Sequence, residues 1–491
     1  MSPVSADIAS VVFTTVGWSI LAYVFVLNSF YAILLVSAAW DTWQHGHAVR
    51  GEERQTVLAS GMAPSVSMLV PAFNEALVIG ESVLSLLTLS YPALEIIVIN
   101  DGSTDDTLAI LTDQFELSPI HPIYRKTLPS KPVHGLYVSR SHPNLIVVDK
   151  ENGSTKADAL NVGVDVASSR LVCAIDADTL VEADAIQRMV RPFLTNDDVV
   201  AAGGTIRLVN GCRVRWGRVI EARVPSAPLA GFQVVEYLRA FLFGRIGWNR
   251  LGGNLIISGA FGLFDRSALL AAGGYASDAP AEDMELILRM RRHGHEHGGP
   301  RRVAFIPDPV AWTEAPETLA LGQQRRRWHR GLADALWRHR GVILAPRYGA
   351  LGLVATPYYF FMELLAPVVE AVGLIAIAAG LILGLLDVPF AILFFLIAYG
   401  YGLLLTVATL LLEEVSFRRY PKPADRLRLL MWAMLEPFGY RQLTVYWRLQ
   451  GLIDFLRGRR DWGVIERRGF RSESATGTPG TTGTSGAGSS G

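Results

Sequence analysis

Apolar residues gather in three long runs, and the chain between the first and second run alternates short apolar stretches with polar ones. The first run extends from Val11 to about Trp40 without a charged residue, and the other two cover residues 351–386 and 389–412. A helix needs only ~20 apolar residues to cross a bilayer. The pattern therefore predicts a membrane protein in which a soluble region separates one N-terminal crossing from C-terminal ones.

Basic residues predict the orientation of these crossings. Residues 1–10 contain no Lys or Arg, whereas Arg50 and Arg54 follow the first run. The positive-inside bias places the N-terminus outside and the chain after Trp40 in the cytosol. A second basic group, Arg418 to Arg428, favours an even number of crossings between Arg347 and Arg418.

The C-terminal runs allow more than one arrangement. Residues 389–412 can cross once. Residues 351–386 can form one crossing plus a shorter interfacial helix broken at Pro357, with two crossings as the alternative. Residues 427–456 are less apolar and flanked by basic residues, which indicates an interfacial or re-entrant segment, with a single crossing as the alternative.

The region from Ser65 to about Pro309 has the pattern of a soluble α/β domain. The stretches SVSMLV, LEIIVIN, NLIVVD and LVCAID are rich in β-branched residues and bounded by turns, as in buried parallel strands. Helical stretches such as 81–89 and 107–115 separate them. This predicts a doubly wound sheet with its ligand at the carboxyl ends of the strands. Residues 118–143 have no periodicity, which predicts a long surface loop.

Composition narrows the range of functions. Of 491 residues, half are apolar, and 45 Lys and Arg balance 45 Asp and Glu, so no overall charge favours nucleic acid as a partner. The two cysteines, Cys173 and Cys212, exclude a disulfide framework and suit a reducing cytosolic compartment.

Polar residues follow several predicted strands at their carboxyl ends. The stretches VPAFNE, with Glu75, and INDGSTDDT, with Asp101, predict a pocket for a nucleotide base or ribose, although turns and helix caps use the same residues. The stretch CAIDADT places Asp176 and Asp178 one residue apart. In an extended segment both side chains point the same way, so both can approach Mg²⁺ or Mn²⁺.

Further candidates open predicted helices. Lys156 lies near a helix start, where a cation and free N–H groups can meet phosphate, although a solvated lysine is equally common. Glu282 and Asp283 open an amphipathic helix, where acidic residues are often only dipole partners. Residues 229–248 fit either an interfacial or a buried helix. The His293 to His297 run is interpreted as a solvated loop.

The stretch QQRRRWHRG places Gln324, Arg327 and Trp328 at i, i+3 and i+4 of a predicted helix, on one face. An indole offers a flat surface for a sugar ring, and Arg and Gln can bind diphosphate. The remaining arginines, Arg325, Arg326 and Arg330, are expected to point elsewhere and meet anionic headgroups.

Taken in order, NDG, the lysine of KADALN, DAD, AED and QRRRW resemble the motifs of the membrane-embedded processive members of glycosyltransferase family 2, which include cellulose, chitin, hyaluronan and poly-N-acetylglucosamine synthases. The resemblance runs from about Ser65 to Gly331. It implies a GT-A-type α/β cytosolic domain with α-helical transmembrane segments. Two departures are Ala281, where the family has Thr, and GSTKAD, where a glycine is expected nearer the lysine.

The resemblance also implies roles for individual residues. Asp283 would be the general base that deprotonates the acceptor hydroxyl. The nucleotide-sugar would be bound by Glu75, Asp101, Lys156, Asp176, Gln324 and Arg327. Trp328, Glu282 and Gly259 would contact the acceptor, while Asp176 and Asp178 would hold Mg²⁺ or Mn²⁺.

These observations predict an inverting, metal-dependent enzyme of the inner membrane that polymerises a polysaccharide from a UDP-sugar and couples it to secretion, as a homo-oligomer or with an export partner. The alternatives are a non-processive transferase to a lipid or lipid-linked acceptor and a non-catalytic, nucleotide-sugar-binding subunit. The expected divisions are a crossing at 1–40, a linker at 41–64, the GT-A domain at 65–315, an interfacial helix at 316–346, membrane and interfacial helices at 347–456, a basic cytosolic segment at 457–471 and a disordered tail at 472–491.

Overall fold

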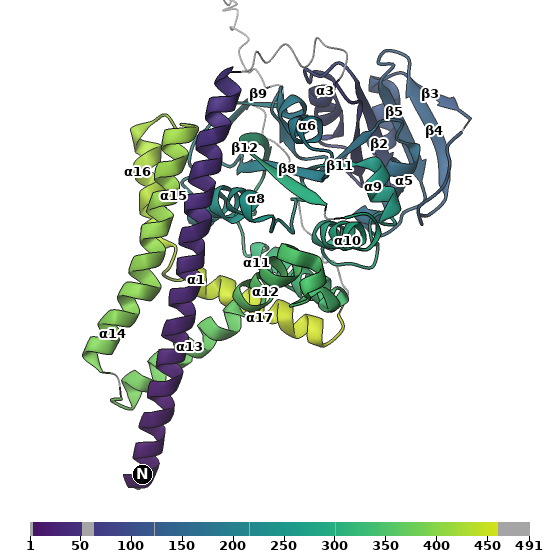
Figure 1. Ribbon diagram of the computed structural model, residues 1–491. Helices are drawn as coiled ribbons and strands as arrows, with labels where there is room; N and C mark the ends of the chain where they lie inside the picture. The colour runs from purple at the N-terminus through teal and green to yellow at the C-terminus, as the bar shows by residue number, and fades with distance from the viewer. Residues whose placement is uncertain are drawn as a thin grey trace, which may run out of the picture.

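A mixed α/β domain lies beside a set of long helices that project from it (Figure 1). The computed structural model describes residues 3–51, 63–121, 123–215, 217–299, 301–385 and 387–459. Residues 52–62 of the expected linker, most of the expected basic segment and the whole expected tail lie outside these residues.

The domain is built on a ten-stranded sheet with the order β3-β4-β5-β2-β1-β6-β11-β8-β12-β7. Its centre is parallel: β1 pairs with β2 and β6, and β2 pairs with β5. The strands with apolar runs in the sequence are β1 (Val66–Ala72), β2 (Leu94–Asn100), β5 (Leu145–Lys150) and β6 (Leu171–Ile175). The prediction of buried parallel strands is confirmed.

Alternate residues of these strands face two separate cores. Met68 and Val70 of β1 belong to one core, whereas Leu69 belongs to the other. The first core is covered by α3 (Ile79–Leu87), α4 (Thr107–Gln114) and α6 (Ala185–Thr195), and the second by α5 (Lys156–Val166), α9 (Arg266–Ala271) and α10 (Glu282–His297). Each strand is thus buried on both faces, which explains its continuous apolar sequence.

The prediction of a long surface loop at residues 118–143 is wrong in part. This region contains β3 (Leu117–Ile120) and β4 (Val133–Ser139), which add antiparallel strands beside β5. Pro119 is tolerated in β3 because that strand forms the edge of the sheet, where a missing N–H leaves no neighbouring strand unpaired. Strands β3 and β4 are also half exposed, so they lack the apolar runs of the central strands.

The other half of the sheet is mixed. Here β11 (Phe261–Asp265) pairs antiparallel with both β6 and β8 (Val199–Leu208), and β12 (Arg302–Thr313) pairs parallel with β8 and antiparallel with β7 (Leu180–Val181). A separate hairpin joins β9 (Arg213–Arg215) and β10 (Arg218–Glu221).

The first helix, α1 (Pro3–Gly51), is much longer than a bilayer requires. Its apolar part, Phe13–Gly46, has 34 residues. From Leu34 onward it packs on the α/β domain, with Ser37 Oγ donating to Gly247 O at 2.8 Å and Asn249 Nδ2 donating to Asp41 Oδ2 at 2.9 Å. The linker expected from residue 41 therefore begins no earlier than 52, because the helix continues along the domain surface.

Two further helical runs are long and apolar enough to cross a membrane, Leu351–Ile382 and Val388–Ser416. The first comprises π-helical η4 (Leu351–Ala355), α12 (Thr356–Tyr358), η5 (Tyr359–Leu364) and α13 (Ala366–Ile382). The helix continues through Pro357 and bends at Leu365. The break that the sequence predicted at Pro357 therefore lies at Leu365 instead. The second comprises α14 (Val388–Phe395), η6 (Leu396–Tyr401) and α15 (Gly402–Ser416).

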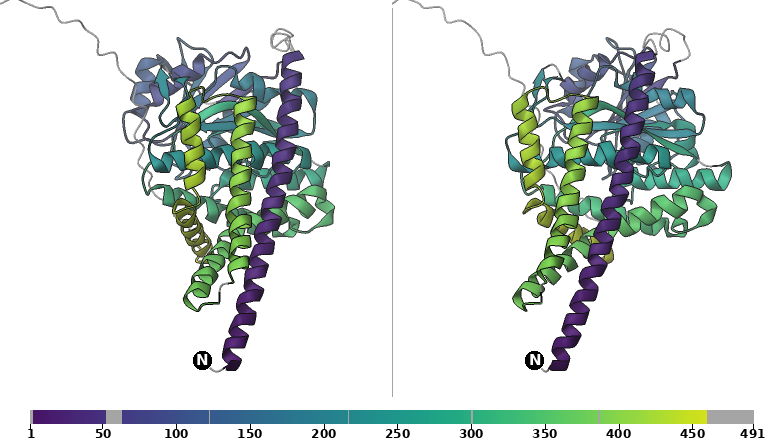
Figure 2. Two further views of the ribbon diagram at one scale, coloured as in Figure 1. Left: turned by 90° about the vertical axis from the view of Figure 1, so that its left-hand side faces the viewer. Right: turned by 60° about the vertical axis from the view of Figure 1, so that its left-hand side comes forward.

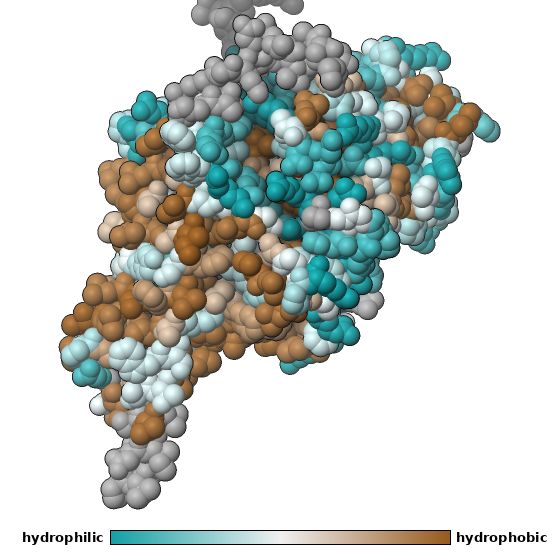
Figure 3. All heavy atoms as spheres, viewed as in Figure 1, coloured by the Kyte–Doolittle hydropathy of each residue, from teal (hydrophilic) through white to brown (hydrophobic). Residues whose placement is uncertain are grey.

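These runs lie alongside α1 in both views of Figure 2. Their exposed side chains are mostly apolar, and Figure 3 shows this apolar surface over the projecting helices, in contrast to the hydrophilic α/β domain. The last helices, α16 (Pro423–Leu435) and α17 (Tyr440–Leu456), turn back toward the domain, and α17 packs along α11 (Leu321–Arg338).

Residues 228–251 form α7 (Pro228–Phe241), η1 (Leu242–Ile246) and α8 (Gly247–Leu251). Trp248 is 1% exposed and packs on Phe30 of α1 and on Tyr358. This stretch is thus largely buried between the sheet and the long helices, which favours the buried interpretation of 229–248.

Candidate active site

The loops after β1 and β2 hold each other in place. Asn74 has a left-handed backbone with φ 56°, and its Oδ1 accepts the Thr104 N–H at 2.8 Å. The Glu75 N–H donates to Thr107 Oγ1 at 2.9 Å. The carboxyl ends of both strands therefore form one rigid edge, as the parallel arrangement requires.

Asp101, at the end of β2, is almost buried and is paired with Lys150 at the end of β5. The Lys150 side chain has no exposed surface and also contacts Asp158 at 2.7 Å. Asp101 Oδ1 accepts the Gly153 N–H at 3.0 Å as well. Sequence reasoning missed Lys150, whose only signal was a charge closing an otherwise apolar strand.

Backbone geometry explains two features of this edge. Gly102 has φ 65°, and a Cβ there would lie 2.7 Å from Asn152 N, so only glycine fits without strain. Ser154 has φ 62°, a conformation that glycine adopts more easily. Ser154, two residues before α5, thus has the left-handed backbone that the glycine expected near the lysine of GSTKAD would adopt more easily.

Lys156, the first residue of α5, lies at the centre of the candidate site. Its Nζ donates to Asp176 Oδ1 at 2.5 Å and to Gly259 O at 2.6 Å. Burial lowers the pKa of Lys156, but the carboxylate of Asp176 raises it, and the net direction is upward. The lysine therefore stays charged. Because its side chain is only 18% exposed and makes both of these contacts, it is not the solvated surface lysine that the sequence left open.

The two aspartates of DAD do not lie on an extended strand. Strand β6 ends at Ile175, and the chain turns at Ala177, with the Thr179 N–H donating to Asp176 O at 3.0 Å. The argument that an extended strand points both carboxylates the same way is wrong, because the turn sets their directions instead. Asp176 and Asp178 are both half-buried.

Asp283 faces Lys156 across Gly259. The Gly259 N–H donates to Asp283 Oδ2 at 3.1 Å, while its carbonyl accepts from Lys156, so one peptide segment links the acid to the cation. Glu282 and Asp283 line a small cavity together with Lys156, Gly259 and Tyr275. Sequence alone could not place Gly259 between the two groups.

Burial changes the acidity of both carboxyl groups that open α10. Burial, then repulsion from Asp283, raises the pKa of Glu282 to about 7, against the lowering influence of Lys156. Burial also raises the pKa of Asp283, against the hydrogen bonds from Met284 N and Gly259 N. A carboxylate with a raised pKa beside a cation is suited to accept a proton near neutral pH.

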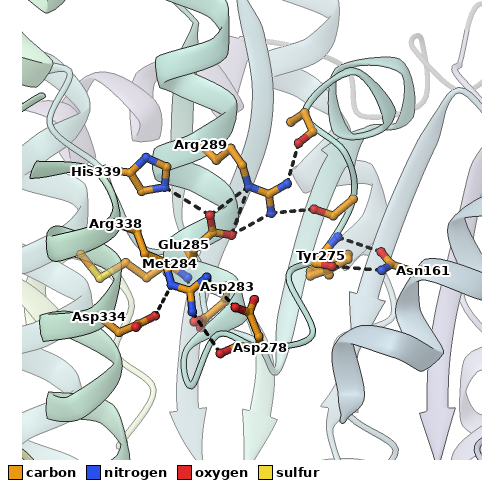
Figure 4. Close-up of polar contacts among 12 residues, drawn as sticks. Asn161, Tyr275, Asp278, Asp283, Met284, Glu285, Arg289, Asp334, Arg338 and His339 are labelled. Carbon is orange, nitrogen blue, oxygen red and sulfur yellow. Dashed lines mark hydrogen bonds and ion pairs between the residues drawn. The ribbon is translucent and has the colours of Figure 1, made fainter. Parts of the chain in front are cut away.

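Polar contacts fix the position of α10 (Figure 4). Glu285 accepts from Arg289 Nη2 at 2.7 Å and contacts His339 Nε2 at 3.2 Å. The side chain of Asn161 in α5 makes two hydrogen bonds to the backbone of Tyr275. Its Oδ1 accepts the Tyr275 N–H at 2.7 Å, and its Nδ2 donates to the Tyr275 carbonyl at 3.0 Å. Asn161 thus joins α5 to the loop that precedes α10, and Arg289 of α10 binds the same loop through Gly274 O at 2.7 Å. His339 joins α10 to the end of α11.

The helix predicted for QQRRRWHRG is present as α11 and is shorter than the expected 316–346. Trp328 is 41% exposed, and Gln324 and Arg327 are half-buried. Within the part of the chain that the structure describes, Gln324 Oε1 is buried without a hydrogen-bond partner. Four residues after Arg327, Gly331 packs on Ala281, so α11 adjoins the start of α10.

The expectation that the remaining arginines meet headgroups is wrong for Arg325 and Arg330, which are each 6% exposed. They are internal because α17 and α7 cover those faces of α11. Arg326 binds Asp454 of α17, with Nη2 to Oδ1 at 2.6 Å, and its side chain stays 36% exposed.

The histidine run also differs from its expectation. Residues 293–297 form the last turns of α10 rather than a loop. The rings of His293 and His297 stack, with their centroids 4.3 Å apart. No group of three or more His, Cys, Asp or Glu side chains suited to a metal ion occurs among the described residues.

The carboxylate oxygens of DAD fit a hard cation that takes its remaining ligands from water and substrate. Asp176 and Asp178 offer only carboxylate oxygens, which Mg²⁺ and Mn²⁺ prefer. Mg²⁺ is usually held by one or two carboxylates and completes its shell with water and substrate phosphates, so two protein ligands are sufficient.

Comparison with known proteins supports the class that this site suggests. Residues 67–270 match the family described as "Glycosyl transferase family 2", and residues 171–407 match "Glycosyl transferase family group 2". The two matches overlap and together include the strand-end loops, α10 and α11. The matched part of the chain, residues 67–407, thus belongs to the glycosyltransferases of family 2.

Among curated relatives, the chain is similar to poly-beta-1,6-N-acetyl-D-glucosamine synthases. It is 29% identical over 274 residues to the protein of Staphylococcus epidermidis and 29% identical over 276 residues to that of Staphylococcus aureus strain COL. In both cases the match covers 56% of this chain and 56% of the relative, so the chain spans little more than half the length of these relatives.

Among solved structures, the fold is similar to that of the mannosyltransferase PcManGT from Pyrobaculum calidifontis in complex with GDP-Man and Mn²⁺. The TM-score is 0.55 at 19% identity, and the match covers 90% of this chain and 99% of the other. At this identity the likeness shows the fold alone, and it confirms the GT-A-type architecture with apolar helices.

Proposed function

We propose that the protein is an inverting, metal-dependent glycosyltransferase that uses a UDP-sugar to extend a polysaccharide at the cytosolic face of the inner membrane. One observation carries the proposal: within the family region, Lys156 and Asp283 bind the two sides of the Gly259 backbone in one buried site. A cation for the leaving diphosphate thus adjoins a base for the attacking hydroxyl.

In this mechanism Asp283 accepts the proton of the acceptor hydroxyl. The hydroxyl oxygen forms a bond to the anomeric carbon as the bond from that carbon to the diphosphate oxygen breaks, and the nucleoside diphosphate leaves with the electron pair. A single displacement inverts the anomeric configuration. Lys156 lies where its charge can stabilise the departing diphosphate, and Arg327 is assigned the same role.

Asp176 and Asp178 would hold Mg²⁺ or Mn²⁺, which supplies charge to neutralise the diphosphate. The metal would compete with Lys156 for Asp176, since the lysine contacts Asp176 Oδ1 in this structure. Glu75 and Asp101 are assigned to the nucleotide, because both lie at the strand edge where the pocket for a base is expected.

The acceptor side would consist of Trp328, Glu282 and Gly259. Similarity to the poly-beta-1,6-N-acetyl-D-glucosamine synthases supports a polysaccharide product, and the three apolar helical runs support synthesis at a membrane. Secretion of the product, through a homo-oligomer or an export partner, belongs to the same proposal.

The experiment is a donor panel with the purified full-length chain in lipid nanodiscs. UDP-GlcNAc, UDP-glucose, UDP-glucuronate and GDP-mannose are each incubated with Mg²⁺, Mn²⁺ or chelator, and nucleotide release and product mass are measured. We expect release with a UDP-sugar, only with metal, and a ladder of products.

Other outcomes select the alternatives. A product carrying one added sugar would indicate a non-processive transferase. Nucleotide release with GDP-mannose and with none of the UDP-sugars would show that the donor is a GDP-sugar and not a UDP-sugar. Absence of nucleotide release with every donor, together with donor binding, would favour a non-catalytic subunit. Activity in chelator equal to that in Mn²⁺ would overturn the metal assignment.

A further inference from the structure

Trp328 and Arg325 differ sharply in exposure although they lie one turn apart on α11. Trp328 is 41% exposed, whereas the Arg325 side chain is 6% exposed. The guanidinium carbon of Arg325 lies 4.6 Å from the centroid of the Trp328 ring. At that distance the planar guanidinium makes a cation–π contact, so one face of the indole is covered from within the protein.

Arg325 is itself held by two other helices. Its Nη2 donates to Glu236 Oε2 of α7 at 2.8 Å. The same oxygen accepts the hydroxyl of Tyr440, the first residue of α17, at 2.7 Å. Burial lowers the pKa of Arg325, but Glu236 raises it, and the net direction is upward. The guanidinium therefore stays charged, and if it moved away, the partly buried Glu236 carboxylate would lose its cation and keep only the hydroxyl of Tyr440.

This cluster adjoins the candidate site. Tyr237, next to Glu236 on α7, is influenced by the charges of both Arg325 and Asp176. Gly331, on the turn of α11 that follows Trp328, contacts Ala281 beside Glu282. The helix that carries Trp328 therefore contacts the start of α10, where Glu282 and Asp283 line the cavity.

We propose that Arg325, fixed by Glu236 and Tyr440, is a positioning residue that holds the Trp328 indole in one orientation and leaves a single face for the acceptor sugar. The inference rests on the proposed function, which assigns Trp328 to the acceptor. An exposed tryptophan that can change rotamer would have to be ordered each time a sugar binds, whereas a stacked one is ordered beforehand.

The chain offers a matched control on the same helix. Arg326 follows Arg325 and also joins α11 to α17 through a buried carboxylate, Asp454, which is 3% exposed. No cation–π contact between Arg326 and Trp328 is found among the described residues. Arg325→Lys and Arg326→Lys therefore both keep a charge in a helix–helix ion pair, but only the first removes a planar group from beneath the indole.

The test compares these variants and Tyr440→Phe by acceptor kinetics with a defined oligosaccharide, using the donor that serves the wild type. We expect Arg325→Lys to raise the acceptor KM about 10-fold and to shorten the product, with donor KM unchanged; this range corresponds to losing one well-ordered contact. Tyr440→Phe should act in the same direction more weakly. Arg326→Lys should leave both KM values within about twofold of wild type.

A readout independent of activity measures Trp328 itself. Acrylamide quenching is recorded for wild type and Arg325→Lys, each with and without Trp328→Phe, so that the difference isolates Trp328 among the 11 tryptophans. We expect stronger quenching of Trp328 in Arg325→Lys. Unchanged quenching together with an unchanged acceptor KM would overturn the inference, as would equal effects in Arg326→Lys. Absence of transfer by the wild type would instead refute the proposed function, and the quenching difference would then decide the inference alone.

Discussion

Gly331 of α11 lies directly against Ala281, the residue that precedes Glu282. A Cβ at Gly331 would come within 2.3 Å of Ala281 Cβ, which is far closer than two carbon atoms can approach. The helix that carries Trp328 and the start of the helix that carries Asp283 thus meet where both residues are small. The family's Thr at position 281 would be larger than Ala at this contact.

The first prediction follows from this contact. Gly331→Ala should force α11 and α10 apart and cost about 1–3 kcal/mol, as overpacked interiors do. Gly341→Ala is the control, because a Cβ at Gly341 would meet nothing within 4 Å. The thermal unfolding midpoint should fall for Gly331→Ala only, and equal midpoints would show that the helices can separate freely.

The second prediction concerns Lys150. Replacing it with Met leaves Asp101 and Asp158 buried without their cation, and breaking such a buried pair costs about 3–5 kcal/mol. Lys131→Met removes a lysine whose pair with Glu151 is about half exposed, and should cost only about 0–1 kcal/mol. Chemical denaturation measures both. Comparable losses would mean that the pair at Lys150 contributes no more than a surface pair.

The third prediction tests the general base. Asp283→Asn should lower kcat by about 10²–10⁴-fold, the range for a lost general base, and leave donor affinity near that of wild type. Asp278→Asn makes the same chemical change in an exposed aspartate of the preceding loop, whose side chain is 57% exposed. It should keep normal turnover. Loss of donor binding in Asp283→Asn would make this residue part of the donor site instead.

The fourth prediction is the pH dependence of turnover. Because burial raises the pKa of Asp283, this base becomes protonated at a higher pH than an exposed aspartate would. Activity should therefore begin to decline on the acid side at a higher pH than an exposed aspartate would give. Titration of kcat against pH provides the measurement.

Glu282→Gln refines this test. It removes the neighbouring negative charge, so the pKa of Asp283 should fall and the acid limb should move to lower pH. An acid limb at the same pH in wild type and Glu282→Gln would contradict coupling between the two carboxyl groups.

The amino-acid sequence by itself determined the features that depend on local pattern. Apolar runs buried on both faces identified the central strands β1, β2, β5 and β6. The helix predicted for the stretch with Trp328 is present, and run length identified the helices able to cross a membrane. Each of these signals comes from periodicity or length, which a chain displays before it folds.

The tertiary structure decided what depends on neighbours far along the chain. Pairing with β5 made strands of β3 and β4, whose half-exposed sequences have no strand signature of their own. The turn after Ile175 set the directions of Asp176 and Asp178. Burial of Lys150 against Asp101, and of Arg325 against Glu236, joins residues 49 and 89 positions apart. A charge shows whether it is solvated or paired only when its partner arrives, because burial without that partner is too costly to persist.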